Sequence, residues 1–579
     1  MKLLGKSASH GIVVGRARVV LSEALKIEAH LIADVEGEIR DFRAALARAK
    51  IRLEAVRDRA LKTLGADKAA IFEAHLLILE DPELVDTTEH MIRERSLNAL
   101  ASYSHVSQAA AQLFDAMDNE YMRERAADVR DVADRVLREL AGVGVADLSE
   151  LQDEVVLVCR DLAPSETAAM NPAKVLGILT DLGGKTSHTA IVARTLEIPA
   201  VLGLRHVTEL VKTGDWVAFD GETGEVEINP DEPTRARYLQ RQEHAKREKL
   251  ELRALVGQPN LSADGIRAEL VANIGSPLDL AGVLNYDAMG VGLYRTEFLF
   301  MDRLEAPSED EQYHAYKTVL EGLAPRPVTI RTLDVGGDKP LAYLEIPKED
   351  NPFLGYRAIR YCLEHPDLFR TQLRAMLRAS VHGNLRVMFP MISSLEELLA
   401  AKEHLEAVRR DLLSKGISVA DEIPVGVMIE VPSAALISDV LAQHCDFLSI
   451  GTNDLIQYTL AVDRLNDRVQ HLYDPFHPGV LRLIRTTIEN TRRFGKKISM
   501  CGEMGGSDLH LPLLLGMGLQ EFSMAPTSIL RLRRQLRGWT LAEAEQLAHE
   551  VSVQSSSRAI ESVLIRARAR KSVQGDLKI

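Results

Sequence analysis

Residues 425–454, VGVMIEVPSAALISDVLAQHCDFLSIGTND, contain the pattern that decides the fold of the C-terminal half. The nearly continuous apolar runs at 425–433 and 447–454 are typical of strands buried on both faces of a parallel sheet. The segment between them has a helical pattern. A strand, a helix and a second strand in this order indicate one unit of an alternating α/β fold.

The same alternation extends from residue 261 to the end of the chain. Eight segments are predicted as strands, with mostly helical patterns between them. Eight buried parallel strands in about 300 residues predict a (β/α)8 barrel, which we assign to residues 261–579. The predicted strands are 268–274, 289–297, 328–336, 385–392, 425–433, 447–454, 498–504 and 521–526.

Polar residues gather at the carboxyl ends of these predicted strands, where barrel enzymes have their active sites. Two of these residues, Arg295 and Arg331, have guanidinium groups that suit phosphate and carboxylate groups. Arg464 could add a third guanidinium. Glu430 and Asp454 are oxygen ligands of the kind that Mg²⁺ prefers. Cys501 is either a proton donor or nucleophile, or only a small buried residue. The pattern predicts a pocket for a small phosphorylated acid. The strand-end residues are Arg295, Glu297, Arg331, Asp334, Glu430, Asn453, Asp454, Cys501 and Glu503.

A second motif, GGKTSHTAIVAR at 183–194, supplies a possible acceptor for the phosphoryl group. Thr186 and Ser187 are candidate N-caps, so a helix is expected over 189–195, with His188 at its amino end, where an anion is favoured. Taken alone, such a histidine is more often a surface or hydrogen-bonding residue. The GKT within the motif is not a nucleotide-binding P-loop, because that motif requires a glycine where Leu179 stands.

The N-terminal half is predicted to consist of an α/β domain with an insertion. Strand-like segments in 1–24 and 143–230 form the α/β domain that carries His188, and 25–142 form an all-α bundle within it. His75 in the bundle is a possible ligand, but is more often an ordinary helix residue. The charged helical stretch within 231–260 is interpreted as a linker helix that could act as a hinge, although a solvated surface helix fits equally well.

The composition indicates an ordinary cytoplasmic globular protein. Seventy basic and 84 acidic residues give a net charge of −14, which argues against nucleic-acid binding and suits a basic protein partner. Four scattered cysteines without a CxxC pair indicate reduced thiols. No apolar run is long enough to span a membrane, so no membrane insertion is expected.

Long segments resemble the PEP-protein phosphotransferases, enzyme I of the PEP-dependent sugar phosphotransferase system, within the PEP-utilising enzymes. GGKTSHTAIVAR is similar to the family's phosphohistidine signature, and DFLSIGTNDLIQYTLAVDR at 446–464 to its PEP-utilising signature. YRTEFLFMDR, RTLDVGGDKP, NPFLGYRAIR, GVMIEVPSA, CGEMGG and GMGLQEFSM are similar to further family blocks. The resemblance extends along essentially the whole chain.

The resemblance implies a function and roles for individual residues. His188 would take the phosphoryl group of phosphoenolpyruvate (PEP) on Nε2, with Thr167 fixing its other ring nitrogen, and pass it to a histidine of the phosphocarrier protein HPr. Glu430 and Asp454 would bind Mg²⁺, and Cys501 would protonate the enolate to release pyruvate. The bundle would dock HPr, the barrel would form a homodimer, and the His188 domain would swivel. The PEP-binding residues would be Arg295, Arg331, Asn453, Asp454 and Arg464.

Two alternatives are weighed against this interpretation. PEP synthase and pyruvate phosphate dikinase share the phosphohistidine and barrel domains but need a large nucleotide-binding domain before the histidine, for which the residues preceding His188 leave no room. A regulatory relay without catalysis is the other alternative. The complete set of strand-end residues argues against it.

Overall fold

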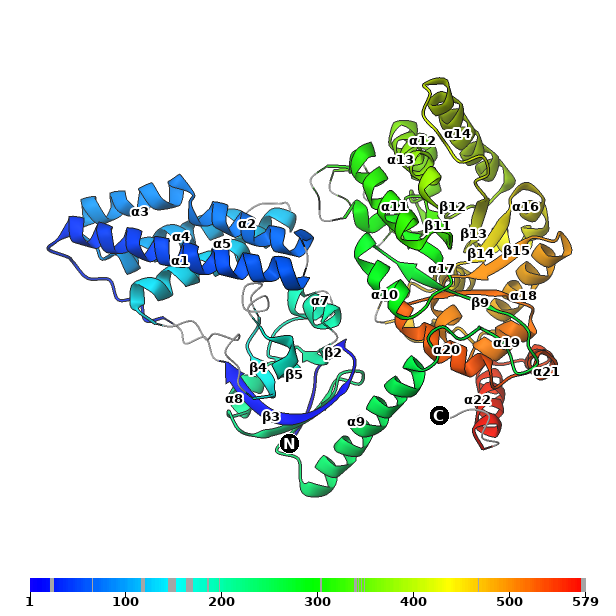
Figure 1. The fold of residues 1–579 in the computed structure, drawn as a ribbon, viewed down its shortest axis with the longest axis horizontal. Coiled ribbons are helices and arrows are strands. Elements are labelled where there is room, and N and C mark those ends of the chain that lie inside the picture. The colour runs from blue at the N-terminus through cyan, green and yellow to red at the C-terminus, as the bar shows by residue number, and fades with distance from the viewer. Residues whose placement is uncertain are drawn as a thin grey trace. The chain divides into compact units, whose positions relative to one another are not determined.

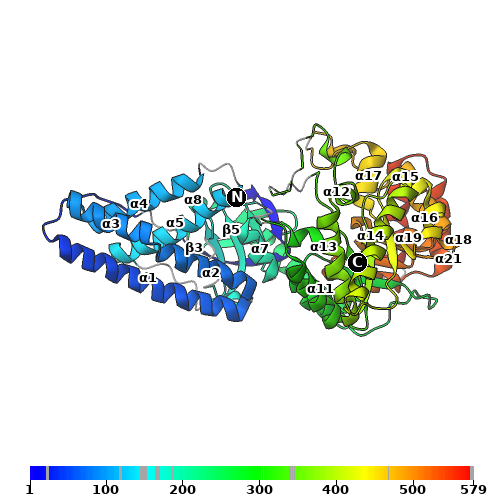
Figure 2. The same ribbon diagram turned by 90° about the horizontal axis from the view of Figure 1, so that it is seen from above.

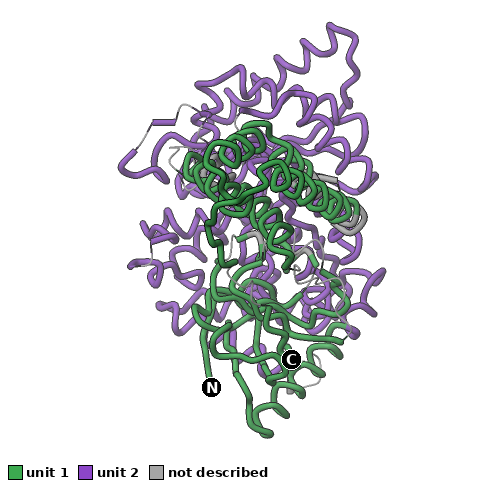
Figure 3. The backbone as a smooth tube through the Cα atoms, turned by 90° about the vertical axis from the view of Figure 1, so that its left-hand side faces the viewer, with its two compact units in different colours: residues 1–249 green, residues 250–579 purple. Residues whose placement is uncertain are grey.

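The computed structural model describes the chain except for residues 21–24, 65, 116–119, 144–152, 163–169, 185–186, 197, 302, 304, 338–340, 342, 345, 348, 467 and 574–579. Two compact units are present, residues 1–249 and 250–579 (Figure 3). Each unit has its own buried core.

The α/β part of the first unit is built on an eight-stranded sheet in the order β1-β8-β7-β3-β4-β5-β6-β2. The N-terminal strand β3 lies at its centre, antiparallel to β7 and parallel to β4. The first 20 residues therefore join strands from much later in the chain. The strands are β1 (Lys2–Leu4), β2 (Lys6–Ser9), β3 (Ile12–Val20), β4 (Val155–Cys159), β5 (Val175–Thr180), β6 (Ala200–Leu202), β7 (Trp216–Asp220) and β8 (Glu225–Ile228).

Two short helices pack on separate cores of this sheet. Helix α7 (His188–Thr195) buries Ala190 and Ala193 against Leu157 and its neighbours. Helix α8 (Val207–Leu210) buries Val207 in the second core. Because the strands are apolar on both faces, they are covered on both sides, as expected for strands at the centre of an α/β sheet.

The predicted insertion is a bundle of helices (Figures 1 and 2). Ile39, Phe42 and Ala49, which recur at helical spacing, are buried in its core, and Leu53 farther along the same helix is also buried. Asp81 caps α3 by accepting from the backbone N–H of Glu83. The helices are α1 (Val35–Leu64), α2 (Ala66–Leu79), α3 (Pro82–Arg95), α4 (Ala99–Asp115) and α5 (Glu120–Ala141).

Helix α9 (Glu232–Arg253) follows the sheet and leads into the second unit. The division between the two units, after residue 249, lies within this helix and within the predicted linker segment. Tyr238 is the only buried residue of α9, so most of the helix is exposed or partly exposed.

The second unit is a closed barrel of eight parallel strands in chain order, β9 to β16, surrounded by helices (Figure 1). The strands are β9 (Glu269–Ile274), β10 (Val291–Arg295), β11 (Pro327–Arg331), β12 (Asn384–Phe389), β13 (Val425–Ile429), β14 (Phe447–Ile450), β15 (Lys497–Met500) and β16 (Glu521–Met524). The helices are α10 (Leu280–Asn285), α11 (Glu309–Leu323), α12 (Ile359–Glu364), α13 (Pro366–Ala379), α14 (Leu395–Ser414), α15 (Pro432–Leu436), α16 (Ser438–His444), α17 (Thr452–Leu460), α18 (Pro478–Arg493), α19 (Leu511–Gly516), α20 (Ile529–Leu536), α21 (Leu541–Ser552) and α22 (Ser557–Val573).

The fold class predicted from the sequence is therefore confirmed, and all eight predicted barrel strands are present. Most of the predicted strands extend too far at their carboxyl ends. Asn453 and Asp454 do not end a strand, because β14 stops at Ile450 and both residues lie in the first turn of α17. Glu297 and Glu503 likewise lie in short 3₁₀ turns after their strands.

Candidate active site

A pocket of about 210 Å³ lies at the carboxyl ends of the barrel strands. Charged and polar side chains from separate βα connections converge on it. All seven of the barrel residues that the sequence assigned to substrate, metal or proton transfer line this pocket. The polar and charged lining residues are Arg295, Glu297, Arg331, Asp334, Arg357, Glu430, Asn453, Asp454, Arg464 and Cys501.

Arg331, the last residue of β11, is held between two carboxylates. Its Nη2 donates to Glu297 Oε1 at 2.7 Å, and its Nη1 lies 2.9 Å from Asp334 Oδ2. Burial lowers the pKa of this guanidinium, but the charges of Glu297 and Asp334 outweigh burial and raise it above its ordinary value. Arg331 is therefore a fixed, permanently charged donor.

Arg357 is a second buried arginine, and its part in the site was not predicted from the sequence. Its Nη2 lies 2.9 Å from Asp334 Oδ1 and 3.6 Å from Asp454 Oδ2, and its Nη1 donates to the Tyr458 hydroxyl at 3.0 Å. Arg357 follows no strand end, since it lies just before α12. The only available signal was its position within the segment NPFLGYRAIR.

Glu430 follows β13 and is almost completely buried. Its Oε1 accepts from the backbone N–H of Met391 at 2.7 Å. Burial, together with the negative charges of Asp454 and Asp334, raises its pKa to about 8. Carboxylates crowded in this way are expected to gain from a cation between them.

Asp454 and Asn453, in the first turn of α17, lie on the side of the pocket next to Arg464. Asp454 Oδ1 is buried without a hydrogen bond to any described residue, and Arg464 Nη1 lies 3.5 Å away. The Asn453 side-chain oxygen accepts from the backbone N–H of Glu503 at 3.0 Å. Its amide N–H₂ group is thus oriented by a contact to the next βα connection.

Cys501 follows β15 and is buried, with its sulfur 3.7 Å from the carbonyl oxygen of Ile450. Burial raises the pKa of the Cys501 thiol, although a hydrogen bond with Ser449 and the charge of Arg331 oppose that shift. The group is therefore a protonated thiol at neutral pH, which suits a proton donor better than a nucleophile.

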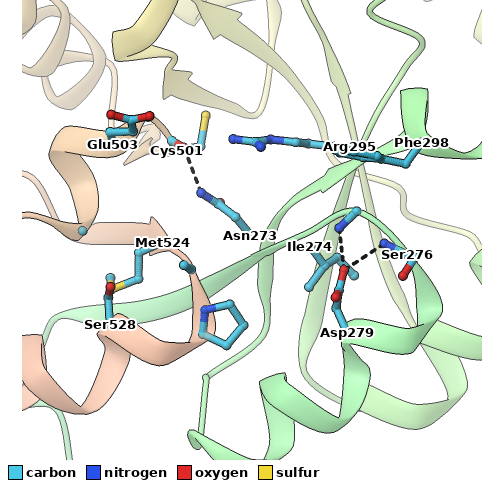
Figure 4. Close-up of a pocket in the computed structure, with 15 residues that line it drawn as sticks. Asn273, Ile274, Ser276, Asp279, Arg295, Phe298, Cys501, Glu503, Met524 and Ser528 are labelled. Carbon is cyan, nitrogen blue, oxygen red and sulfur yellow. Dashed lines mark hydrogen bonds between the residues drawn. The ribbon is translucent and has the colours of Figure 1, made fainter. Parts of the chain in front are cut away.

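A second hollow of about 520 Å³ adjoins this pocket (Figure 4). Arg295 and Cys501 line both, and the Arg295 side chain extends toward Cys501. Arg295 makes no ion pair with any residue that the structure describes. Asn273, at the end of β9, donates from Nδ2 to the carbonyl oxygen of Cys501 at 3.0 Å, a contact that the sequence did not indicate.

His188 lies outside the barrel, as the first residue of α7. The Ser187 side chain caps this helix by accepting from the backbone N–H of Ala190, and Gly183 adopts a φ of +101° in the preceding turn. The backbone therefore agrees with the predicted helix start at this motif. The side chain of His188 and the whole of Thr167 lie outside the described residues.

His75 in the bundle is fully buried, with Nε2 3.2 Å from Asp128 Oδ1 and Nδ1 3.6 Å from Asp131 Oδ2. It therefore links α2 to α5 inside the bundle, in agreement with the plainer of its two interpretations.

Three family models of PEP-utilising enzymes match the chain: the N-terminal domain at 4–125, the mobile domain at 151–224 and the PEP-binding domain at 249–541. The fold and the pocket thus define a PEP-utilising enzyme. Phosphoenolpyruvate-protein phosphotransferases of Bacillus sp. (strain S) and Geobacillus stearothermophilus are each 52% identical over 94% of this chain and 95% of their own length. The protein of the same name from Staphylococcus carnosus is 48% identical over 94% of this chain and 96% of its own. The chain belongs to the phosphoenolpyruvate-protein phosphotransferase family.

A solution structure of an Enzyme I (nEIt) protein is also similar, with 45% identity and a TM-score of 0.39 over 42% of this chain and 99% of its own. Within the described part of the chain, no helix is both long and apolar enough to cross a membrane.

Proposed function

We propose that this protein transfers the phosphoryl group of PEP to His188 Nε2 and then to a histidine of the phosphocarrier protein HPr, with release of pyruvate. This is the first step of the sugar phosphotransferase system. The observation that supports it most strongly is the convergence of arginines, buried carboxylates and one protonated thiol on a single small pocket. Such a set suits a substrate that carries a phosphate, a carboxylate and an enol carbon needing a proton.

Substrate binding is assigned to the cations and the amide. Arg295 has no carboxylate partner among the described residues, Arg464 has only Asp454 at 3.5 Å, and Arg331 is fixed by its two carboxylates. Together with Asn453, they would hold the phosphate and carboxylate of PEP through charge-assisted hydrogen bonds. Neutralisation and in-line alignment are the main demands of phosphoryl transfer.

Mg²⁺ is assigned to Glu430 and Asp454. Among the described residues, no cluster of three or more metal-ligating side chains is present. Two carboxylates are nevertheless enough for Mg²⁺, which completes its shell with water and substrate phosphate. The buried Asp454 Oδ1 without a hydrogen bond and the raised pKa of Glu430 fit such a cation. When bound, it would neutralise charge on the phosphoryl group.

The proposed chemistry balances without any further reactant. The bond between phosphorus and the enol oxygen of PEP breaks, and a bond between phosphorus and His188 Nε2 forms. The resulting enolate takes a proton at C3 from the Cys501 thiol and becomes pyruvate. The thiolate then regains a proton from solvent.

The remaining assignments rest on the family relationship. His188 would be carried by the α/β domain of 1–24 and 143–230, with Thr167 orienting its ring, and HPr would dock on the bundle of 25–142. A swivel about 231–260 would bring His188 to the PEP-binding barrel of 261–579. We also propose a homodimer through the barrel and a cytoplasmic location. The acidic net charge of −14 fits a basic carrier.

A labelling experiment tests the proposal. PEP labelled with ³²P and Mg²⁺ are added to the full-length protein, and acid-labile phosphate and pyruvate are measured. We expect one pyruvate for each phosphate bound, and no label in His188→Ala. His206→Ala is the matched control, since His206 is an exposed histidine of the same α/β domain. Undiminished labelling of His188→Ala would contradict the assignment.

A further inference from the structure

The opposite end of the barrel contains another large hollow, of about 620 Å³. It lies below the amino ends of the strands, where barrel residues usually serve stability. Its lining carries five cationic side chains and only two carboxylates, in a chain whose net charge is −14. We call it the floor pocket. Its charged lining residues are Arg267, Glu269, Asp287, Arg326, Arg386, Lys497 and Arg533.

Three of these cations have carboxylate partners. Arg386 Nη1 lies 3.2 Å from Glu521 Oε2, and Lys497 Nζ lies 3.3 Å from Glu269 Oε1. The buried Arg533 Nη1 lies 2.8 Å from Asp287 Oδ2. In each pair the two charges neutralise one another. The first two pairs link strands of the barrel, and the third links α20 to the segment before β10.

Arg267 and Arg326 are the two cations that remain. Neither has a carboxylate within ion-pair distance among the residues that the structure describes. Arg267 is exposed, and the half-buried Arg326 donates from Nη1 to the carbonyl oxygen of Ala288 at 2.8 Å. With Glu521 included, five cations meet three carboxylates, which leaves an excess of two positive charges.

We propose that the floor pocket is a second anion site, which binds a small phosphomonoester through Arg267 and Arg326. The charge excess equals the charge that a phosphomonoester carries near neutral pH. Guanidinium groups are the preferred partners of such a group because they donate in pairs. The volume is in the range of pockets that hold whole small molecules, and is larger than an inorganic ion needs. Gln258, Asn260 and Asn384 line the same hollow and offer amides for sugar or glycerol hydroxyls.

The pocket also borders the point where the chain enters the barrel from α9. Residues 258–261 contribute to its lining, only a few residues after α9 ends at Arg253. A bound ligand would therefore contact this entry segment directly. The backbone amides of the entry segment should exchange their hydrogens more slowly when the pocket is filled.

Ribose 5-phosphate is the probe for the first test, by calorimetric titration of the full-length protein. We expect the double variant Arg267→Gln/Arg326→Gln to weaken binding by at least about tenfold, because two charge-assisted contacts are lost. Arg410→Gln, an exposed arginine on α14, is the matched control and should bind as the wild type does. Arg295→Gln at the other end of the barrel should also leave this binding intact.

Four results would overturn the proposal. These are no binding to the wild type at millimolar concentrations, equal binding by the double variant, loss of binding in Arg295→Gln alone, and inorganic phosphate binding as tightly as ribose 5-phosphate. A second measurement does not depend on the variants folding. Hydrogen exchange of the wild type with ribose 5-phosphate should slow in segments 258–268 and 326–330, whereas protection only around 451–464 would assign the ligand to the other end.

Discussion

The two ends of the barrel use the same residue types in different ways. At the amino ends, the half-buried Arg386 and the buried Glu521 meet as a pair. The guanidinium groups there that have no carboxylate partner among the described residues reach water. At the carboxyl ends, the buried atoms Arg331 Nε, Arg357 Nε and Asp454 Oδ1 have no hydrogen-bond partner among the described residues. An unsatisfied buried polar atom costs about 1–3 kcal/mol. A site that keeps several of them is expected to recover this free energy from a ligand.

A matched pair of substitutions, Glu430→Gln and Glu521→Gln, tests this difference between the two ends most strongly. Both carboxyl groups are buried, and burial raises the pKa of both. Glu430→Gln should lower PEP-dependent turnover by at least about 10³-fold, because the proposed Mg²⁺ ligand, worth several kcal/mol, is lost. Its thermal midpoint should stay the same or rise, since repulsion with Asp454 is removed.

Glu521→Gln should do the reverse. Turnover should stay within about threefold of the wild type, and the melting temperature should fall by about 2–6 °C because Arg386 loses its partner. Steady-state kinetics and calorimetry measure both quantities. A fall in turnover of similar size in both variants would show that the two ends are not functionally distinct.

The sequence predicted the barrel well because its strands are buried on both faces. Such strands are nearly continuous apolar runs, and in a closed barrel their polar continuations must converge on one end. Strand lengths were less predictable. The run at 328–336 extends beyond Arg331, where β11 ends, because apolar residues continue into the connection and are buried there.

Arg357 and Asn273 show what the sequence could not predict. Arg357 reaches Asp334 from a connection with no periodic pattern, and Asn273 reaches Cys501 across more than 200 residues of chain. Both contacts depend on how separate connections pack over the barrel, which local patterning does not encode. The proposed approach of His188 to this site would likewise depend on motion between the units rather than on local sequence.

The next effect concerns the proton that Cys501 is proposed to donate at the carboxyl ends of the barrel strands. Cys501→Ala should lower the rate of pyruvate formation by about 10²–10³-fold, the usual contribution of a positioned general acid. The affinity for PEP should change little, because the thiol carries no charge. Since burial raises the pKa of Cys501, the wild-type rate should not decline between pH 7 and 8 from loss of this proton. Stopped-flow measurement of pyruvate against pH tests both statements.

The matched control is Cys362→Ala, another buried cysteine of the barrel with a raised pKa. It should keep wild-type turnover. A rate that fell with an apparent pKa near 8 in the wild type and was pH-independent in Cys501→Ala would contradict the proposed proton donor.

His510 tests whether every unsatisfied buried atom belongs to the active site. It follows Cys501 in the same connection and is buried on Phe476, with Nε2 lacking a hydrogen bond to any described residue. Burial lowers its pKa to about 4. Below pH 6.5, His510 therefore takes up a proton in the unfolded chain but stays neutral in the folded chain until the pH nears 4.

Stability from neutral His510 is fully present above pH 6.5 and is lost as the pH falls toward 4, by an amount on the order of 3 kcal/mol. His510→Gln should flatten the dependence of the melting temperature on pH within this window, while turnover at pH 7.5 stays nearly constant. Subtracting the two melting curves cancels the carboxylates that both proteins share. An unchanged difference from pH 4 to 7 would mean that folding does not lower the pKa of His510.

The smallest expected effect concerns Asn273, a residue at the carboxyl ends of the strands whose side chain is fully hydrogen-bonded. Its Nδ2 donates to the carbonyl oxygen of Cys501, and its Oδ1 accepts from Ser523 at 2.6 Å, so both ends of its amide are hydrogen-bonded and it positions the proposed proton donor. Asn273→Ala should lower the turnover number by about fivefold, the equivalent of one hydrogen bond, with the KM for PEP unchanged. Ser523→Ala, which removes only the support of the amide, should have a smaller effect in the same direction. If Asn273→Ala instead raised KM without changing turnover, the amide would contact the substrate rather than position Cys501, and the pocket would extend into the hollow of Figure 4.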